Sequence, residues 1–179
     1  PPEQWSGSGP ISSKLEPASG PEPDHCSGGG NDDMRIYYPA ELDDPGFFGL
    51  YPLVVISHGN GHCFDWYDFL GEHLASYGYI VMSHDNDTGP GIETASTTTL
   101  LFTDEILREQ GTLGAGVLAG HIDSTRIAWI GHSRGGEGVA RAYDRLVDEG
   151  YPSEFYDAGD IVVISSIAPT DFLGPDESD

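Results

Sequence analysis

One serine in this sequence stands between glycines, in the stretch GHSRGG that follows the apolar run IAWI. Gly131, Ser133 and Gly135 match the pattern G-x-S-x-G, in which a sharp turn between a strand and a helix exposes the serine hydroxyl. A serine held in this way can attack a carbonyl carbon, and the N-terminus of the following helix favours the negative charge that develops. The pattern therefore predicts nucleophilic chemistry at Ser133.

The two glycines have a steric explanation. A Cβ atom at Gly131 or Gly135 would collide with the neighbouring strand or helix, because the turn brings these elements close together. The alternative interpretation is a glycine-rich turn that carries an incidental serine. The strand predicted before the turn and the helix predicted after it favour the first interpretation.

Alternating apolar runs and amphipathic segments predict the elements that position this turn. A strand rich in β-forming residues runs from Met34 to near Pro39. Four buried strands are expected near 53–57, 79–83, 126–130 and 161–166, and helices near 65–77, 94–110 and 136–149. This alternation predicts an α/β fold with a mainly parallel sheet and helices on both faces. The loops at 58–64, 84–91 and 131–136 then converge at the carboxyl ends of the strands.

The sequence divides into two parts. Residues 1–31 are rich in Pro, Gly and Ser and contain few apolar residues, which predicts a flexible leader or linker. Residues 32–179 form one domain by length. Cys26 and Cys63 could form a disulfide if the protein is exported, although two cysteines in 179 residues are unremarkable as free thiols, which is the favoured interpretation.

Charge excludes several kinds of partner. Lys and Arg number 7 against 30 Asp and Glu, which gives a formal net charge of −23. Such a protein repels nucleic acids and anionic membrane surfaces. No apolar stretch approaches the roughly 20 residues that span a bilayer, so no membrane insertion is expected. The acidity fits either adaptation to high salt or an ordinary acidic secreted protein, and a self-repelling surface favours a monomer.

Residues 34–171 resemble the first two thirds of an α/β-hydrolase. The GHSRGG turn is similar to that of plant chlorophyllases, and the order of the VVISHGNG, LASYGYIVMSHDND and GHSRGG segments resembles bacterial polyester hydrolases, dienelactone hydrolases and platelet-activating-factor acetylhydrolases. The resemblance implies a three-layer α/β-hydrolase fold. It also implies a serine esterase that needs no cofactor and cleaves carboxylic esters through an acyl-enzyme on Ser133.

The resemblance also implies an oxyanion hole. The HGNG loop, residues 58–61, follows a predicted strand, and by position the backbone N–H groups of Asn60 and Arg134 are the two donors. The alternative is that HGNG is an ordinary turn. Polyester hydrolases usually carry an aromatic residue where Asn60 stands, so a flat cleft for an aromatic polymer is not expected here.

Five other residues in or near these loops have side chains that bear on the site. His62, Phe64 and Trp66 could line the substrate entrance, although core packing explains the two aromatic residues equally well. By the family pattern, His132 points away from the serine and His58 packs in its loop, so neither is expected to be the base.

Two carboxylates follow the second predicted buried strand. Asp85 and Asp87 could suggest a cation site, but acidic residues in such a loop are more often solvated turn residues. No metal is therefore predicted.

A catalytic histidine is missing from the expected place. The family order is Ser, then Asp or Glu, then His, yet all seven histidines lie at or before position 132. Asp171 is a candidate acid, and the expectation is that the usual acid and the histidine lie beyond residue 179. The alternatives are a base from the N-terminal half, a non-catalytic module that has lost its base, and an acyltransferase or peptidase on the same scaffold.

We expect the protein to be secreted, periplasmic or exposed at the surface of a bacterial cell. The sequence begins Pro-Pro rather than Met, its first residues are linker-like, and its composition is acidic. Mass spectrometry of the native protein should find a cleaved precursor, and an intact cytoplasmic N-terminus would contradict this expectation.

Overall fold

The structure is a computed structural model that describes residues 13–18, 34–89 and 93–171. At its centre lies a six-stranded sheet in the order β1-β2-β4-β3-β5-β6. The strands are β1 (Ser13–Ala18), β2 (Met34–Pro39), β3 (Tyr51–Ser57), β4 (Ile80–His84), β5 (Ile122–His132) and β6 (Ile161–Ile167). β3, β4, β5 and β6 run parallel, whereas β1 and β2 are antiparallel to their neighbours.

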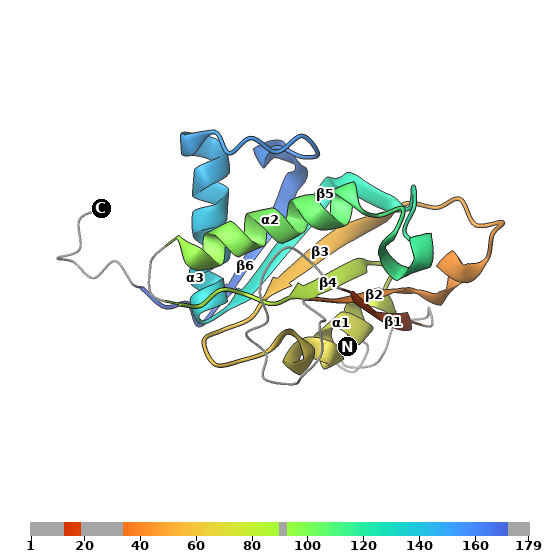
Figure 1. The fold of residues 1–179 in the computed structure, drawn as a ribbon, viewed down its shortest axis with the longest axis horizontal. Coiled ribbons are helices and arrows are strands. Elements are labelled where there is room, and N and C mark those ends of the chain that lie inside the picture. The colour runs from red at the N-terminus through yellow and green to blue at the C-terminus, as the bar shows by residue number, and fades with distance from the viewer. Residues whose placement is uncertain (1–12, 19–33, 90–92, 172–179) are drawn as a thin grey trace, which may run out of the picture.

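Helices cover both faces of the sheet (Figure 1). α1 (Asp68–Ala75) lies on one face, and α2 (Thr94–Arg108) and α3 (Arg134–Asp144) pack against each other on the opposite face. Shorter helical turns occupy Ala40–Asp43, Phe64–Tyr67, Leu113–Gly116, Arg145–Glu149 and Ala158–Asp160. The predicted mainly parallel α/β fold is confirmed, and this three-layer arrangement fits the α/β-hydrolase fold.

The apolar runs of β3 and β4 belong to strands that are buried on both faces. Alternate residues of a strand point to opposite sides of the sheet. Leu53 and Val55 belong to the core beneath α2 and α3, whereas Val54 and Ile56 belong to the core beneath α1. Each run therefore supplies two cores at once, which explains why it is continuously apolar.

α1 packs on the sheet through small residues. Gly71 and Ala75 are its buried positions, and a Cβ atom at Gly71 would lie 2.4 Å from the ring of Tyr37 on β2. Trp66 and Phe69, which lie at helical spacing in the helix predicted near 65–77, are instead 58% and 72% exposed. Leu70 and Leu74 pack against the core cluster beneath α1, so the side of the turn and helix that carries Trp66 and Phe69 faces outward.

Part of the predicted leader forms a strand. β1 pairs antiparallel with β2, from Ser13 opposite Pro39 to Ala18 opposite Met34. The expectation of a linker is therefore wrong for residues 13–18, since pairing at a sheet edge needs backbone groups rather than apolar side chains. Residues 1–12 and 19–33, which include Cys26, lie outside the described residues. Cys63 has no disulfide partner among those described.

β6 is less buried than its apolar sequence suggests. Ile161 is buried, but Val162 and Val163 are 56% and 50% exposed, and Ile164 and Ile167 are also exposed. The predicted strand near 161–166 is confirmed, but the expectation that it is buried is wrong for all of it except Ile161 and the partly buried Ser165. The physical reason is that β6 pairs with β5 alone in this sheet and forms its edge.

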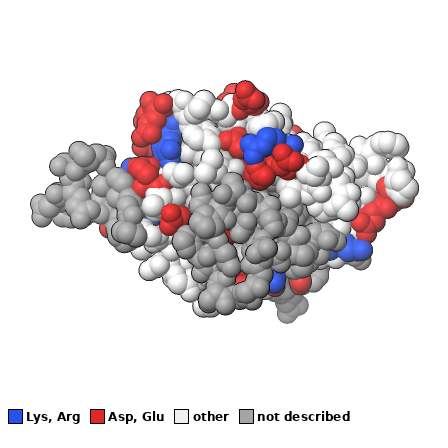
Figure 2. Space-filling view, viewed as in Figure 1, with Lys and Arg blue, Asp and Glu red and all other residues white. Residues whose placement is uncertain are grey.

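Carboxylates outnumber basic groups on the surface, and each basic side chain lies beside one of them. Figure 2 shows lysine and arginine side chains adjacent to acidic ones rather than gathered in a separate patch. Every one of the seven basic side chains forms an ion pair, for example Lys14 with Asp43 and Arg126 with Asp123. Within the described ranges, no helix has the length and apolar character needed to cross a membrane.

The contact between α1 and Tyr37 gives a stability test. Gly71→Ala should lower the free energy of unfolding by about 1–3 kcal/mol, because the new methyl group has no space beside the ring. The control is Gly111→Ala, since a Cβ atom there has no neighbour within 4 Å. Urea denaturation measures both. Equal stability of the two variants would contradict this account of α1 packing.

Candidate active site

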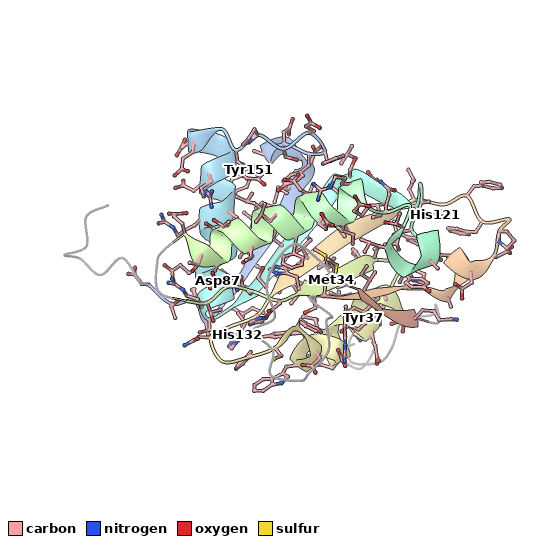
Figure 3. All side chains as sticks on the ribbon, in the orientation of Figure 1. Met34, Tyr37, Asp87, His121, His132 and Tyr151 are labelled. Carbon is pink, nitrogen blue, oxygen red and sulfur yellow. The ribbon has the colours of Figure 1, made fainter. Side chains whose placement is uncertain are left out.

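The three loops singled out in the sequence meet at one end of the sheet. Ser57 at the end of β3 is paired with His84 at the end of β4 and with Gly131 near the end of β5. Figure 3 shows Asp87 and His132 together at this end, with His121 at the other end. The predicted convergence of these loops is confirmed.

Ser133 has a strained backbone conformation. It lies between β5 and α3 with φ 54° and ψ −116°, a region that non-glycine residues rarely adopt. Strain of this kind costs on the order of 1–3 kcal/mol and persists where the surrounding structure imposes it. Here the Ser133 N–H donates to the carbonyl of Ile167 (2.9 Å), and its carbonyl accepts from the N–H groups of Glu137 and Thr170 (both 3.2 Å).

Two close approaches explain the flanking glycines. A Cβ atom at Gly131 would lie 2.1 Å from the carbonyl oxygen of Gly135 at the start of α3. A Cβ atom at Gly135 would lie 2.1 Å from the carbonyl oxygen of Ser57 on β3. Both distances are far below van der Waals contact, so the steric reason predicted for the two glycines is confirmed.

The HGNG loop lies directly against this turn. A Cβ atom at Gly59 would be 2.9 Å from Cβ of Ser133 and 3.0 Å from Nδ1 of His132. The structure therefore brings the loop that contains Asn60 against Ser133, which Arg134 directly follows in the chain. The Asn60 side chain is exposed, and its Oδ1 accepts a hydrogen bond from Thr88 (3.0 Å).

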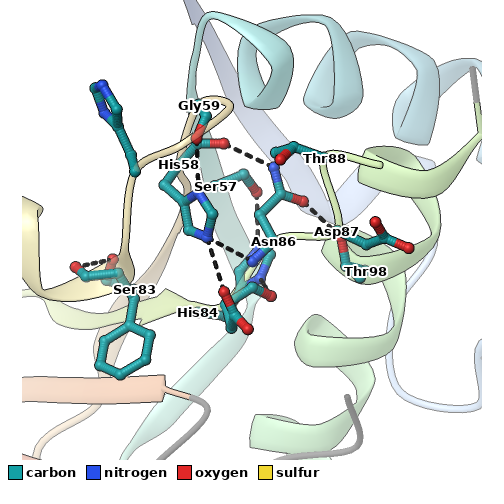
Figure 4. A network of polar contacts seen from close by, with 12 residues as sticks. Ser57, His58, Gly59, Ser83, His84, Asn86, Asp87, Thr88 and Thr98 are labelled. Carbon is teal, nitrogen blue, oxygen red and sulfur yellow. Dashed lines mark hydrogen bonds and ion pairs between the residues drawn. The ribbon is translucent and has the colours of Figure 1, made fainter. Parts of the chain in front are cut away.

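A buried polar network supports the HGNG loop (Figure 4). His58 is 1% exposed, and its Nδ1 donates to the carbonyl of Gly59 (2.9 Å). Its Nε2 lies 3.0 Å from Oδ1 of Asp85 and accepts the N–H of Asn86 (2.8 Å). The Asn86 side chain donates to the His58 carbonyl (2.7 Å). His58 thus packs in its loop, and the loop is fixed to the segment after β4.

The same network continues into α2. Oδ1 of Asn86 accepts the hydroxyl of Thr98 (2.5 Å), and the hydroxyl of Ser57 lies 2.9 Å from that of Thr99. Ser57 also contacts Nε2 of His84 (2.8 Å). His84 is fully buried, and this burial lowers the pKa of its imidazole to about 4.

The two carboxylates after β4 have different environments. Asp85 is 1% exposed, so the expectation of a solvated turn residue is wrong for it. Its partner His58 lies 27 positions earlier, and neither the spacing nor the composition indicated this contact. Asp87 does act as a turn residue, because its Oδ1 accepts the N–H of Gly89 (2.8 Å). Across the described ranges no cluster of three or more His, Cys, Asp or Glu side chains could hold a metal ion.

A second polar cluster lies beside Ser133. The Tyr67 hydroxyl is 3.1 Å from Nδ1 of His62 and 3.0 Å from Nδ1 of His132. The pKa of His62 is lowered, first by burial and then by the positive charge that His132 and His58 can carry. The pKa of Tyr67 is raised by burial, and a backbone hydrogen bond from Gly59 acts in the opposite direction. Sequence reasoning found His62 but missed Tyr67, which had no motif to mark it.

The residues predicted to line a substrate entrance separate into two groups. Trp66 is exposed, and its ring centroid lies 4.6 Å from that of His62. Phe64 is 6% exposed and packs beneath the guanidinium of Arg35 at 5.8 Å, so its assignment to an entrance is wrong. Core packing, the alternative explanation of the aromatic residues, applies to Phe64.

A buried ion pair follows the serine. The Arg134 side chain is 1% exposed, and its Nη1 lies 3.0 Å from Oε2 of Glu137. The same oxygen accepts the hydroxyl of Thr170 (2.7 Å). These contacts hold the segment after β6 against α3, and the candidate acid Asp171 is the next residue in that segment.

In the part of the chain that the structure describes, the Ser133 hydroxyl is not hydrogen-bonded to a histidine. The Nδ1 atoms of His132 and His62 contact Tyr67, and His58 is engaged by Gly59, Asp85 and Asn86. The structure thus assembles the serine, the HGNG loop and the helix N-terminus without a bonded base.

The chain is similar to one protein family and to several individual proteins. Residues 5–146 match the family described as PETase: PET hydrolase-like. The chain is 30% identical over 141 residues to cutinase est2 of Thermobifida alba and 32% identical over 144 residues to cutinase 2 of Thermobifida cellulosilytica. These alignments cover 79% of this chain and 42% and 48% of the relatives, so the chain spans about half their length.

A relative with a different name matches a shorter region. The chain is 33% identical over 107 residues to a bis(hydroxyethyl) terephthalate hydrolase of Streptomyces coelicolor, which covers 60% of this chain and 32% of that protein.

The buried His84 predicts acid sensitivity. Its folded-state pKa of about 4 lies below the ordinary histidine value of 6.5, so the unfolded chain binds the extra proton between these values. Stability is therefore fully present above about pH 6.5 and falls as the pH drops toward 4, by about 3 kcal/mol at most. His84→Gln should remove this part of the pH dependence, as measured by urea denaturation at pH 7 and pH 4.5. His73→Gln on α1 is the control, and an unchanged pH dependence in His84→Gln would contradict the assignment.

Proposed function

Because the chain belongs to the PET hydrolase-like family, we propose that it acts as a carboxylic-ester hydrolase with Ser133 as its nucleophile. The observation that carries the proposal is the conformation of Ser133, which has φ 54°. It lies between a strand and a helix that leave no space for a Cβ atom at Gly131 or Gly135. A binding module gains nothing from a strained serine, whereas a nucleophile requires the exposed hydroxyl that this turn provides.

The proposed chemistry proceeds in two steps. The Ser133 oxygen attacks the ester carbonyl while a base accepts its proton, and the carbonyl oxygen becomes an oxyanion facing the N–H groups of Asn60 and Arg134. The C–O bond to the alcohol then breaks, the alcohol leaves with a proton, and an acyl-enzyme remains. Water attacks the acyl group in the same way and releases the acid. Each preorganised donor contributes roughly 3–4 kcal/mol to the transition state.

The base and acid are proposed to come from residues beyond 179. The family order places Asp or Glu and then His after the serine. Asp171 remains a candidate acid, since the N–H of the preceding Thr170 donates to the carbonyl of Ser133. A non-catalytic module, an acyltransferase and a peptidase are the competing functions.

The proposed substrate is an uncharged ester. The names cutinase and bis(hydroxyethyl) terephthalate hydrolase among its relatives support a carboxylic ester. The net charge of −23 disfavours anionic substrates. The exposed Trp66 beside His62 offers an aromatic surface near the serine, and both are proposed to contact the substrate. We further propose an exported monomer that needs no cofactor.

Replacing the serine tests the proposal. In the full-length protein, Ser133→Ala should lower the rate of p-nitrophenyl ester hydrolysis by a factor on the order of 10⁴ or more, because the acyl-enzyme cannot form. A fluorophosphonate should label Ser133, as peptide mass spectrometry can detect. Ser124→Ala, at the opposite end of β5, is the matched control and should keep its activity.

Two outcomes would change this assignment. A full-length protein that binds fluorophosphonate elsewhere and hydrolyses no ester would support one of the competing functions. Residues 1–179 alone should show little turnover, since an oxyanion hole without a base leaves residual catalysis. Full activity of that segment would identify an upstream histidine, such as His58 or His62, as the base.

A further inference from the structure

The hydroxyl of Tyr67 connects three segments around Ser133. Tyr67 ends the helical turn Phe64–Tyr67, and its hydroxyl contacts His62 in the loop after β3 and His132 at the end of β5. A backbone hydrogen bond from Gly59 reaches the same hydroxyl. One oxygen atom thereby joins the HGNG loop to the residue that precedes the serine.

The hydrogen-bonding capacity of this oxygen is fully used. A phenol has one proton to donate and two lone pairs that accept. The Gly59 N–H occupies one lone pair, one imidazole N–H occupies the other, and the phenol proton goes to the second imidazole. Each of the three bonds therefore depends on the other two for its direction.

The partners of the Tyr67 hydroxyl are the sequence neighbours of two residues with proposed catalytic roles. Gly59 immediately precedes Asn60, and His132 immediately precedes Ser133. The two backbone segments are already in contact, since a Cβ atom at Gly59 would lie 2.9 Å from Cβ of Ser133. A change in their separation would move the Asn60 N–H relative to the serine oxygen.

We propose that Tyr67 is a positioning residue whose hydroxyl fixes the distance between the oxyanion-hole loop and Ser133. This inference rests on the proposed function, because it assigns a catalytic consequence to that distance. A displacement of about 1 Å at such a site can cost on the order of 100-fold in rate. Removal of the hydroxyl leaves the loop held by the His58 network, so a smaller displacement and a smaller loss are expected.

The substitution Tyr67→Phe isolates the hydroxyl. The Tyr67 ring packs against the core cluster of Tyr37, Val54 and Ile56, and this packing is kept in phenylalanine. The variant should therefore fold. Tyr151→Phe is the matched control, because it removes a tyrosine hydroxyl that donates to Asp104 (2.7 Å), and Tyr151 lies at a distance from His132, the residue before the serine (Figure 3).

The kinetic experiment uses the full-length protein, a soluble p-nitrophenyl ester and an alkyl boronic acid that forms a tetrahedral adduct with the serine. Tyr67→Phe should lower kcat about tenfold with little change in KM, and should weaken boronic acid binding by the same factor. A phosphonate titration should find the same fraction of active sites as in the wild type. Tyr151→Phe should change none of these values.

Unchanged kcat and boronic acid affinity in Tyr67→Phe would overturn the proposal and leave the ester hydrolase function intact. A loss of titratable active sites in proportion to kcat would also overturn it, because that pattern indicates partial unfolding. Amide hydrogen exchange of residues 59–62 gives a readout that needs no activity. It should be about tenfold faster in Tyr67→Phe, and unchanged exchange would overturn the proposal even if the wild type hydrolysed no ester.

Discussion

The architecture around Ser133 depends on the contact between the start of α3 and the end of β3. Because Gly135 lies against the carbonyl of Ser57 with no space for a Cβ atom, the helix begins directly over the sheet. This contact forces the chain to turn within one residue, and Ser133 takes the strained conformation as a result. It also places the loop that leaves β3 beside the serine. The arrangement of serine, loop and helix N-terminus is thus a consequence of backbone packing, and side chains refine it.

Buried polar side chains then fix the position of the loop after β3. Buried polar groups are costly unless they have partners, and in the network of Ser57, His58 and Asn86 each side chain has at least two. A network of this kind tolerates few alternative arrangements, because a shift of the loop would leave several buried groups without a partner. It therefore holds the loop after β3 in one position relative to the loop after β4.

The sequence predicted the features that arise from local patterns. Runs such as LVVIS are apolar because both faces of the strand are buried, and the glycines around Ser133 are required by a steric contact. The buried strand and the tight turn could therefore be found without a structure. Features that depend on distant partners were missed. Asp85 was expected in solvent because nothing near it in the sequence indicates His58. Trp66 and Phe69 have the spacing of a core-facing helix, yet they face outward because Leu70 and Leu74 pack against the core instead. β1 was missed because edge pairing uses backbone groups that every residue carries.

The threonines of α2 limit how far this protein can be stabilised by design. Threonine is a weaker helix former than alanine or leucine, so a propensity-based redesign would replace it. Thr98 donates to Asn86 and Thr99 contacts Ser57, so both complete the network under the HGNG loop, and Thr103 accepts the indole N–H of Trp129. Replacing these threonines with stronger helix formers would leave their buried partners without a hydrogen bond. Substitutions that raise thermal tolerance are therefore easier to make on the outward face of α2 than on the face whose threonine hydroxyls form these buried hydrogen bonds.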